Sequence, residues 1–373
     1  MSGRDDKRAD VSDQLRVLVI SPFGAMGGQE RWLLQLLDAT DRLAAEVVLL
    51  SDGPLKGELR CRGVPTAVLE TGRSPEAIGR AGLRLAQVLR RRRPQVVLAN
   101  GVKAAAAGAV ARRFTRVPVV WMKHDLSFDG WLAAPLGGMV DSVIAISSGV
   151  AAALGRPVPV LPPPLPTVDF VVAGEARAHW VERFPSLHQA QVVGMLTRLV
   201  PYKGVDDVVT ALGYPAARAW HAVVVGDDDP STPGERDRLR RVAERFGVAT
   251  RVHFAGAVPS GARLIRGFDA VAVTTRREGS FGGEGFPLAA LEALAAGVPL
   301  VGTGETPALQ TMARAGGLAV PASDPEAIAE ALARLQRPEE RARAREGART
   351  FVAGHPNARQ VADAMVRHLM AAC

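Results

Sequence analysis

Two clusters of residues in the second half of the chain combine side chains and spacing that suit a diphosphate. In residues 284–299, glycines and Pro287 precede an apolar helical pattern that a glycine and a second proline end. The free amides and positive dipole end of such a helix start form an anion site, and the glycines let a phosphate approach the backbone. Glu292 lies two turns along this helix. Alternatively, Glu284 and Glu292 are surface carboxylates on an amphipathic helix.

The second cluster lies in residues 192–204, where a strand pattern runs into a loop that contains Arg198 and Lys203. Two cations at the carboxyl end of a parallel strand occupy the place where open α/β sheets bind ligands, and a diphosphate is their natural counterpart. A solvated loop is the alternative. Because both clusters fall in the same half of the chain, together they predict a diphosphate site.

A histidine at a strand end is a third candidate. His124 follows the fifth predicted strand and directly precedes Asp125. A histidine in that position acts either as a local hydrogen-bonding residue or as part of a functional site. The sequence leaves both interpretations open.

The elements that must position these residues follow from short β-branched runs that alternate with helical patterns. Strands are expected at residues 17–20, 47–50, 96–99, 117–121 and 142–146, and again at 191–197, 222–225, 252–254, 270–274 and 300–302. Helices are expected at residues 29–37, 77–93, 150–154, 205–212, 235–246, 287–296, 325–335 and 359–370. This rhythm predicts an α/β protein with two doubly wound domains, each built on a parallel sheet.

A proline cluster marks the expected domain boundary. Six prolines crowd the ten positions from Pro157 to Pro166, a density that neither a helix nor a central strand tolerates. We expect a loose polar tail at residues 1–14, an N-terminal Rossmann-like domain at 15–165, a linker at 166–190, a C-terminal Rossmann-like domain at 191–354 and a C-terminal helix at 355–373. That last helix is expected to pack back toward the N-terminal domain.

Composition excludes several classes of protein. Hydrophobic residues make up 47% of the 373 positions, without the apolar run of roughly 18 residues that a membrane-spanning helix needs. The N-terminal residues are charged and lack the apolar stretch of a signal peptide, so a cytoplasmic protein is expected. Cys61 and Cys373 have no metal-ligand spacing and predict neither a disulfide framework nor a zinc site.

Positive charge is concentrated in the first half of the chain. Residues 1–165 carry 22 Lys and Arg against 15 Asp and Glu, which accounts for +7 of the net charge of +8. An anionic ligand or a peripheral contact with an anionic membrane is therefore expected to involve this half. Nucleic acid is not expected as a partner.

Taken together, these motifs resemble the family 4 retaining glycosyltransferases, which have the GT-B fold of two facing Rossmann-like domains with a cleft between them. The similarity runs from Val17 to about Val366. Its most specific parts are Glu284-Gly-Phe with Glu292-Ala-Leu, Gly194 with Arg198 and Lys203-Gly204, and Val225-Gly226-Asp227. Its weaker parts are Gly27-Gly28-Gln29-Glu30-Arg31, His124-Asp125, Ile146-Ser147 and Phe254-Ala255-Gly256.

The resemblance implies roles for the residues that match. Arg198 and Lys203 are expected to bind the donor diphosphate, with backbone around Gly285 and Phe286 completing the phosphate cradle. Glu292 is expected to accept hydrogen bonds from the ribose hydroxyls.

For the sugar and the cleft, the resemblance implies that Glu284 faces the donor sugar and that His124 contacts the sugar being transferred. Gly27 and Gly28 line the cleft from the N-terminal domain, and residues 252–256, which end at Gly256, border the base.

The reaction that the family implies is transfer of a sugar from a nucleoside-diphosphate sugar to an acceptor hydroxyl, with retention. The acceptor is a small-molecule natural product or a lipid-linked or cell-envelope glycan. The donor is a co-substrate, so no cofactor is expected, and no metal ion either. Asp227-Asp228-Asp229 resembles the Asp-x-Asp metal motif of GT-A glycosyltransferases, but we favour an acidic turn, since the GT-B pattern explains many more residues.

Three other functions remain for comparison. A nicotinamide-dependent oxidoreductase lacks support because Gly24-Ala-Met-Gly27-Gly28, after the first strand, does not match Gly-x-Gly-x-x-Gly. A noncatalytic nucleotide-sugar-binding protein is compatible with the fold, but a degenerate copy is expected to lose the cleft residues, and Arg198, Lys203, Glu284 and Glu292 are all present. A GT-B sugar-nucleotide epimerase is the nearer alternative.

Overall fold

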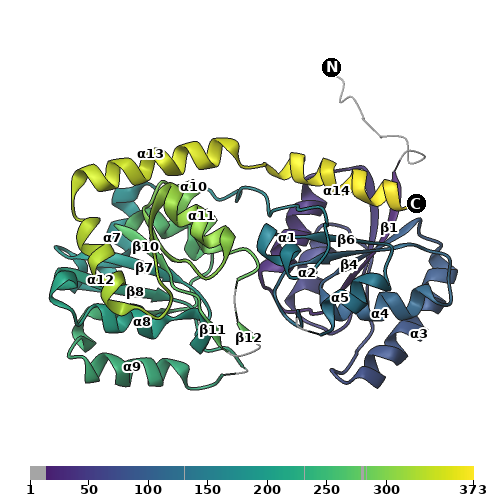
Figure 1. Ribbon diagram of the computed structural model, residues 1–373, viewed down its shortest axis with the longest axis horizontal. Coiled ribbons are helices and arrows are strands. Elements are labelled where there is room, and N and C mark those ends of the chain that lie inside the picture. The colour runs from purple at the N-terminus through teal and green to yellow at the C-terminus, as the bar shows by residue number, and fades with distance from the viewer. Residues whose placement is uncertain (1–13, 130, 231, 279–280, 283) are drawn as a thin grey trace, which may run out of the picture. The chain divides into compact units, whose positions relative to one another are not determined.

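The computed structural model describes residues 14–129, 131–230, 232–278, 281–282 and 284–373. The chain divides into two compact units, shown with their elements in Figure 1. The first unit runs to Pro164 and also includes Pro356–Cys373, while Leu165–His355 form the second.

The first unit contains a six-stranded parallel sheet in the order β3-β2-β1-β4-β5-β6. Its strands are β1 (Leu15–Ser21), β2 (Leu43–Leu49), β3 (Thr66–Val68), β4 (Val96–Asn100), β5 (Val119–Lys123) and β6 (Ser142–Ala145). Its helices are α1 (Gly28–Asp38), α2 (Pro54–Cys61), α3 (Pro75–Arg92), α4 (Val102–Arg112), α5 (Ala133–Gly138), α6 (Ser148–Ala152) and α14 (Ala358–Ala372). In this strand order the chain reverses direction across the sheet between β1 and β4, where doubly wound sheets bind ligands.

The second unit repeats this topology with the strand order β14-β13-β10-β7-β8-β9. Its parallel strands are β7 (Gln191–Leu196), β8 (Trp220–Val225), β9 (Val252–Gly256), β10 (Ala270–Val273), β13 (Leu300–Thr303) and β14 (Gly317–Val320), and β11 (Arg277–Glu278) pairs with β12 (Phe281–Gly282) as a separate hairpin. Its helices are α7 (Ala173–Arg183), α8 (Val205–Ala211), α9 (Glu235–Arg245), α10 (Leu288–Ala296), α11 (Pro307–Gly316), α12 (Pro325–Arg334) and α13 (Pro338–Gly354). The reversal point here lies between β7 and β10.

Short turns of 3-10 helix connect several of these elements in the second unit. They are η2 (Pro185–Leu187), η3 (Pro201–Lys203), η4 (Pro215–Ala217), η5 (Ala249–Arg251) and η6 (Gly261–Gly267). The strands are apolar runs because helices cover both faces of each sheet, so both sets of side chains are buried. All five residues of β4 and of β5 are buried, including Lys123. The prediction of two doubly wound α/β domains with parallel sheets is confirmed.

The sequence patterns did not predict several elements, for identifiable reasons. The α4 helix is buried along most of its alanine-rich length, so it lacks the polar face that makes a helix periodic. Residues 166–190, expected to be a linker, contain α7 and belong to the second unit. Trp180 of α7 is fully buried and stacks on Phe268 with ring centroids 5.2 Å apart. This contact with a residue distant in the sequence orders α7, although the local sequence of that segment is irregular.

The helix α14 belongs to the first unit, where Val361, Met365 and Leu369 are buried. A capping box starts it: the Asn357 side chain accepts a hydrogen bond from Gln360 N, and the Gln360 side chain accepts one from Asn357 N, each 2.9 Å long. No helix in the described part of the chain is both long enough and apolar enough to cross a membrane.

Replacing Asn357 with alanine is expected to lower the free energy of unfolding by about 1 kcal/mol, because one amide at the helix start loses its acceptor. Asn357→Asp keeps that acceptor and should stay close to wild type. Urea denaturation of the three proteins measures the difference. Equal losses for the alanine and aspartate variants would contradict a capping role.

Candidate functional site

The cationic loop lies at the carboxyl ends of β7 and β10, the two strands that flank the reversal point of the second sheet. The Thr274 hydroxyl, just past β10, donates to the carbonyl oxygens of Lys203 (3.1 Å) and Gly204 (2.8 Å). Gly204 has φ 65°, and a Cβ there would lie 2.2 Å from the Thr274 carbonyl oxygen. The loop therefore needs glycine at 204, and its fixed backbone holds Lys203 at the sheet edge.

Lys203 forms an ion pair with Glu284, so the structure brings together the two clusters that the sequence singled out. Both side chains are mostly buried, with 15% and 20% of their surface exposed. They line a narrow cavity of about 30 Å³, together with Thr275 and Pro287. A cation and a carboxylate thus meet at the sheet edge where ligands of this fold bind.

Burial lowers the pKa of Lys203 to about 7, and the positive charge of Arg198 adds to the shift. The Glu284 carboxylate opposes it by stabilising the ammonium form. The charge of Lys203 consequently depends on pH in the neutral range, which is unusual for a lysine.

Arg198 lies at the end of β7 with 63% of its side chain exposed. Its guanidinium pairs with Asp229 at 2.5 Å and donates to the Tyr202 hydroxyl at 3.2 Å. An anion at this loop must compete with Asp229 or share the guanidinium with it. Arg198 is therefore an exposed cation that a ligand can reach.

The helix α10 begins at Leu288, and Pro287 precedes it in an extended conformation. Pro287 therefore lies just before the helix, which begins one residue later than the sequence predicted. Gly285 is buried and Phe286 is half-buried, with its ring 5.9 Å from that of His355. The amides of Ala290 and Leu291 donate to the Pro287 carbonyl, so Leu288 and Ala289 carry the helix-start amides that have no partner within the helix. Glu292 is half-buried farther along the helix and does not line the cavity. Gly283 lies outside the described residues.

The turn after β8 meets the end of β9 at Gly256. Gly226 has φ 151° and donates its N–H to the Gly256 carbonyl at 2.9 Å. A Cβ at Gly226 would lie 1.7 Å from the Thr197 carbonyl oxygen, so glycine is required beside the cationic loop. Gly256 is thus the last residue of β9, which β8 separates from β7.

The carboxylates of the acidic turn at 227–229 make their contacts within the protein. Asp227 pairs with Arg236 and accepts from Ala257 N, and Asp228 accepts from the backbone N–H groups of Gly234 and Arg236 at the start of α9. Among the described residues, no group of three or more His, Cys, Asp or Glu side chains could hold a metal ion.

In the first unit, three sequence positions gather near the reversal point of the sheet. Gly27 precedes α1 and Gly28 begins it. Asn100, the fully buried last residue of β4, donates to the Gln29 carbonyl at 3.3 Å, and its Oδ1 lies 2.6 Å from His124 Nε2. Asn100 thus links the start of α1 to the histidine that follows β5.

Burial lowers the pKa of His124 to about 3, and neighbouring Lys123 lowers it further in the same direction. The imidazole is therefore neutral at physiological pH. Because Asn100 uses its amide N–H on Gln29, its Oδ1 accepts, and His124 must carry its proton on Nε2. Nδ1 is left as an acceptor, so His124 can receive a hydrogen bond but is not an acid.

Sequence patterns missed three residues of these sites. Asn100 ends a strand that has no motif, and Thr275 follows β10 with a buried hydroxyl that has no hydrogen-bond partner. The fully buried Lys123 pairs with Asp129 at 2.6 Å and fixes the loop after His124. Their shared signal is a polar residue at the carboxyl end of a buried strand, which is visible once the strand boundaries are known.

Two family models match the chain and together span most of it. Glycosyltransferase Family 4 matches residues 26–167, and Glycosyl transferases group 1 matches residues 177–351. Both sheets, both reversal points and the paired Lys203 and Glu284 fall within or beside these matches. The chain belongs to the group 1 glycosyltransferases of family 4, with the GT-B fold.

Among its curated relatives, the chain is 36% identical over 197 residues to the D-inositol 3-phosphate glycosyltransferase of Acidothermus cellulolyticus, covering 51% of this chain and 42% of that protein. It is 34% identical over 183 residues to a GDP-mannose-dependent alpha-(1-6)-phosphatidylinositol monomannoside mannosyltransferase of Mycobacterium tuberculosis, covering 47% and 46%. The matches thus span less than half the length of these relatives.

Solved structures resemble the whole chain in fold. Anabaena Alr3699/HepE in complex with UDP and glucose has a TM-score of 0.83 at 21% identity, covering 96% of this chain and 100% of that one. Sucrose-phosphate synthase from Thermosynechococcus elongatus has a TM-score of 0.78 at 20% identity, covering 96% and 100%. At these identities the likeness concerns the fold.

Proposed function

We propose that this protein transfers a sugar from a nucleoside-diphosphate sugar to an acceptor hydroxyl, with retention at the anomeric carbon. The observation that carries the proposal is the pairing of Lys203 with Glu284 at the reversal point of the second sheet, beside the start of α10. A cation and free helix amides suit a diphosphate, and an adjacent carboxylate suits sugar hydroxyls.

In the reaction, the bond between the anomeric carbon and the phosphate oxygen breaks, and its electron pair leaves with the nucleoside diphosphate. The acceptor oxygen forms the new bond and loses its proton. Negative charge grows on the leaving phosphate, so Arg198, Lys203 and the amides around Gly285 and Phe286 stabilise the transition state. When the diphosphate takes Lys203, Glu284 is released from its ion pair and turns to the donor sugar.

The other residues bind and orient. Glu292 accepts hydrogen bonds from the ribose hydroxyls, and Gly256 borders the base. Gly27 and Gly28 contribute backbone from the first unit. The neutral His124, whose tautomer Asn100 sets, accepts a hydrogen bond from a hydroxyl of the transferred sugar through Nδ1.

The donor proposal is tested by thermal unfolding in the presence of a panel of nucleotide sugars that includes UDP-glucose and GDP-mannose. A ligand at 100 times its dissociation constant adds about 2.7 kcal/mol to stability. We expect one donor to raise the melting temperature more than its free sugar does. A panel without any stabilising nucleotide sugar would contradict the proposal.

Activity is expected to persist in excess chelator, because Arg198, Lys203 and the start of α10 neutralise the diphosphate without a metal ion. The acidic turn at 227–229 is already occupied by Arg198, Arg236 and backbone amides. Transfer rates before and after chelation provide the measurement. Complete loss that manganese restores would instead assign the turn to metal binding.

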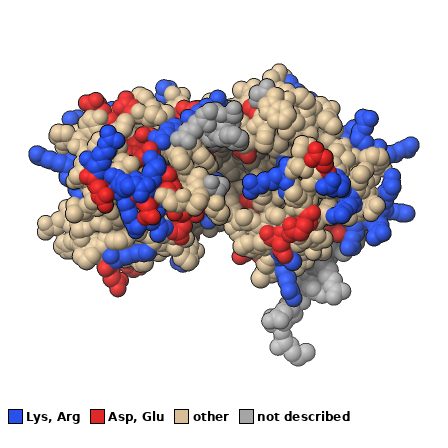
Figure 2. Space-filling model, turned by 90° about the horizontal axis from the view of Figure 1, so that it is seen from below, with Lys and Arg blue, Asp and Glu red and all other residues tan. Residues whose placement is uncertain are grey.

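For the acceptor, we propose a hydroxyl compound that carries a phosphate, either free or as a lipid headgroup. The names of two relatives specify an inositol phosphate and a phosphatidylinositol mannoside, and the first half of this chain carries +7. The residues at 90–93 are four exposed arginines at the end of α3, and Figure 2 shows basic side chains gathered on the first unit.

Binding to vesicles with and without anionic lipid distinguishes the two forms of acceptor. A lipid acceptor predicts binding to anionic vesicles at low salt, which weakens as the Debye length shortens. No binding at low salt would remove the peripheral membrane contact and leave a soluble phosphorylated acceptor.

A further inference from the structure

A second cavity lined by described residues lies away from the paired Lys203 and Glu284. Its volume is about 530 Å³, and it follows the outer edge of β14, the edge strand of the second sheet. We call it the β14 groove. It shares no lining residue with the cavity beside Lys203. Its size falls in the range of small-molecule sites.

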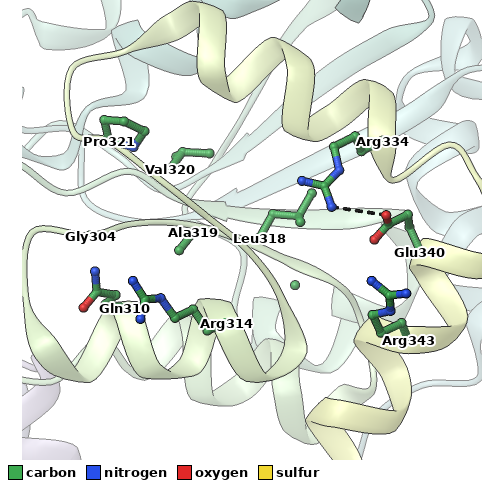
Figure 3. A pocket seen from close by; sticks show the side chains of 11 residues that line it. Gly304, Gln310, Arg314, Leu318, Ala319, Val320, Pro321, Arg334, Glu340 and Arg343 are labelled. Carbon is green, nitrogen blue, oxygen red and sulfur yellow. Dashed lines mark hydrogen bonds and ion pairs between the residues drawn. The ribbon is translucent and has the colours of Figure 1, made fainter.

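Three arginines from three different helices surround the strand in Figure 3: Arg314 of α11, Arg334 of α12 and Arg343 of α13. Glu340 is the acidic residue in the lining and pairs with Arg334 at 3.1 Å. Arg314 and Arg343 make no ion pair or hydrogen bond with any other residue that the structure describes. The lining therefore carries a net charge of +2, with two guanidinium groups unpaired.

The strand itself adds backbone donors to the groove. The Val320 carbonyl accepts from Gly304 N at 2.9 Å, so the backbone groups of Val320 face β13. Along a strand these groups alternate between its two sides, so the residues adjacent to Val320 in the sequence direct theirs away from β13. Ala319 is such a residue; it is exposed and lines the groove, so its N–H and its carbonyl both face this edge. Gln310 of α11 supplies a side-chain amide to the same cavity.

These groups define a ligand of particular chemistry. A phosphate monoester carries a charge near −2 at neutral pH and presents three acceptor oxygens, which match a net +2 lining and the fork geometry of arginine. The volume also leaves room beyond a phosphate for a small polar body. We propose that the β14 groove binds a small phosphorylated metabolite, separately from the donor site.

The probe for calorimetry is ribose 5-phosphate, with ribose as the uncharged control and UDP and GDP present at saturation to fill the donor site. We expect one equivalent to bind, ribose not to bind, and the affinity to fall with salt. Arg314→Gln and Arg343→Gln should each weaken binding about tenfold, the effect of losing one charged hydrogen bond. Arg345→Gln, an exposed arginine on α13 outside the groove, should leave binding unchanged.

Glu340→Gln separates ligand binding from a purely structural role of the cluster. The substitution releases Arg334 and raises the net charge of the lining, so binding should strengthen. Unchanged nucleoside-diphosphate affinity in every variant shows that the fold is intact. Absence of saturable ribose 5-phosphate binding below about 10 mM, a range weaker than ordinary metabolite sites, would overturn the proposal. Equal affinity in all the variants, or binding that disappears when nucleotide is added, would do the same.

Discussion

Lys203→Gln is expected to weaken the binding of bare nucleoside diphosphate about tenfold to a hundredfold, because one charge-assisted hydrogen bond to phosphate is lost. The lysine is held at the sheet edge by Thr274 and lies 85% buried, so no other side chain can easily replace it. Calorimetry with the diphosphate measures the loss.

Lys203→Arg is the matched control, since it keeps the positive charge at this position. Because the pKa of Lys203 is lowered to about 7, the wild-type lysine is charged below that pH and loses its charge as the pH rises. The affinity of wild type, relative to the arginine variant, should therefore fall between about pH 6 and about pH 9. The comparison cancels the titration of the nucleotide itself. Parallel pH profiles for the two proteins would remove Lys203 from the diphosphate site.

Glu284→Gln is expected to lower turnover by about a hundredfold while leaving the affinity for bare diphosphate equal or tighter at about pH 6. In its proposed role the carboxylate contacts the sugar and its developing charge, so its loss is expected to lower the rate. It also pairs with Lys203, and its removal leaves that lysine free for the anion.

Glu292→Gln is expected to weaken the binding of the nucleotide, in contrast to Glu284→Gln. If Glu292 holds the ribose, the amide is a poorer acceptor, and binding of both the nucleotide sugar and the bare diphosphate should weaken about tenfold to a hundredfold. Calorimetry and steady-state rates on both variants give the test. Small, equal effects from the two would mean that neither glutamate contacts the donor.

The sequence could single out the residues of the proposed donor site because each lies in a locally distinctive segment. Arg198 and Lys203 follow a strand of buried apolar residues, and Glu284 precedes a proline and an apolar helix, so strand and helix signals place them without tertiary information. What the sequence could not show is that Lys203 pairs with Glu284, because 80 residues separate them and a folded sheet edge brings them together. The lowered pKa of Lys203 follows from that burial.

The first unit shows the converse case. Asn100 ends a buried apolar strand, and its contacts reach Gln29 and His124, each at least 24 positions away. The tautomer of His124 follows from this distant amide, and its neutral state follows mainly from burial in the fold, to which the adjacent Lys123 adds. The arginines of the β14 groove were missed for a similar reason, since each lies on an ordinary amphipathic helix and only the edge of β14 brings them together.

The central claim is that the second unit carries a donor site from which a sugar is transferred. The most direct test is to incubate wild type and Glu284→Gln with nucleotide sugars and a phosphorylated acceptor, to follow product by mass and to determine its anomeric configuration by NMR. We predict that wild type converts one donor into free nucleoside diphosphate and a glycosylated product with the donor's anomeric configuration, and that Glu284→Gln binds the same donor but converts it about a hundredfold more slowly. Product of inverted configuration, or equal rates in the two proteins, would contradict this account.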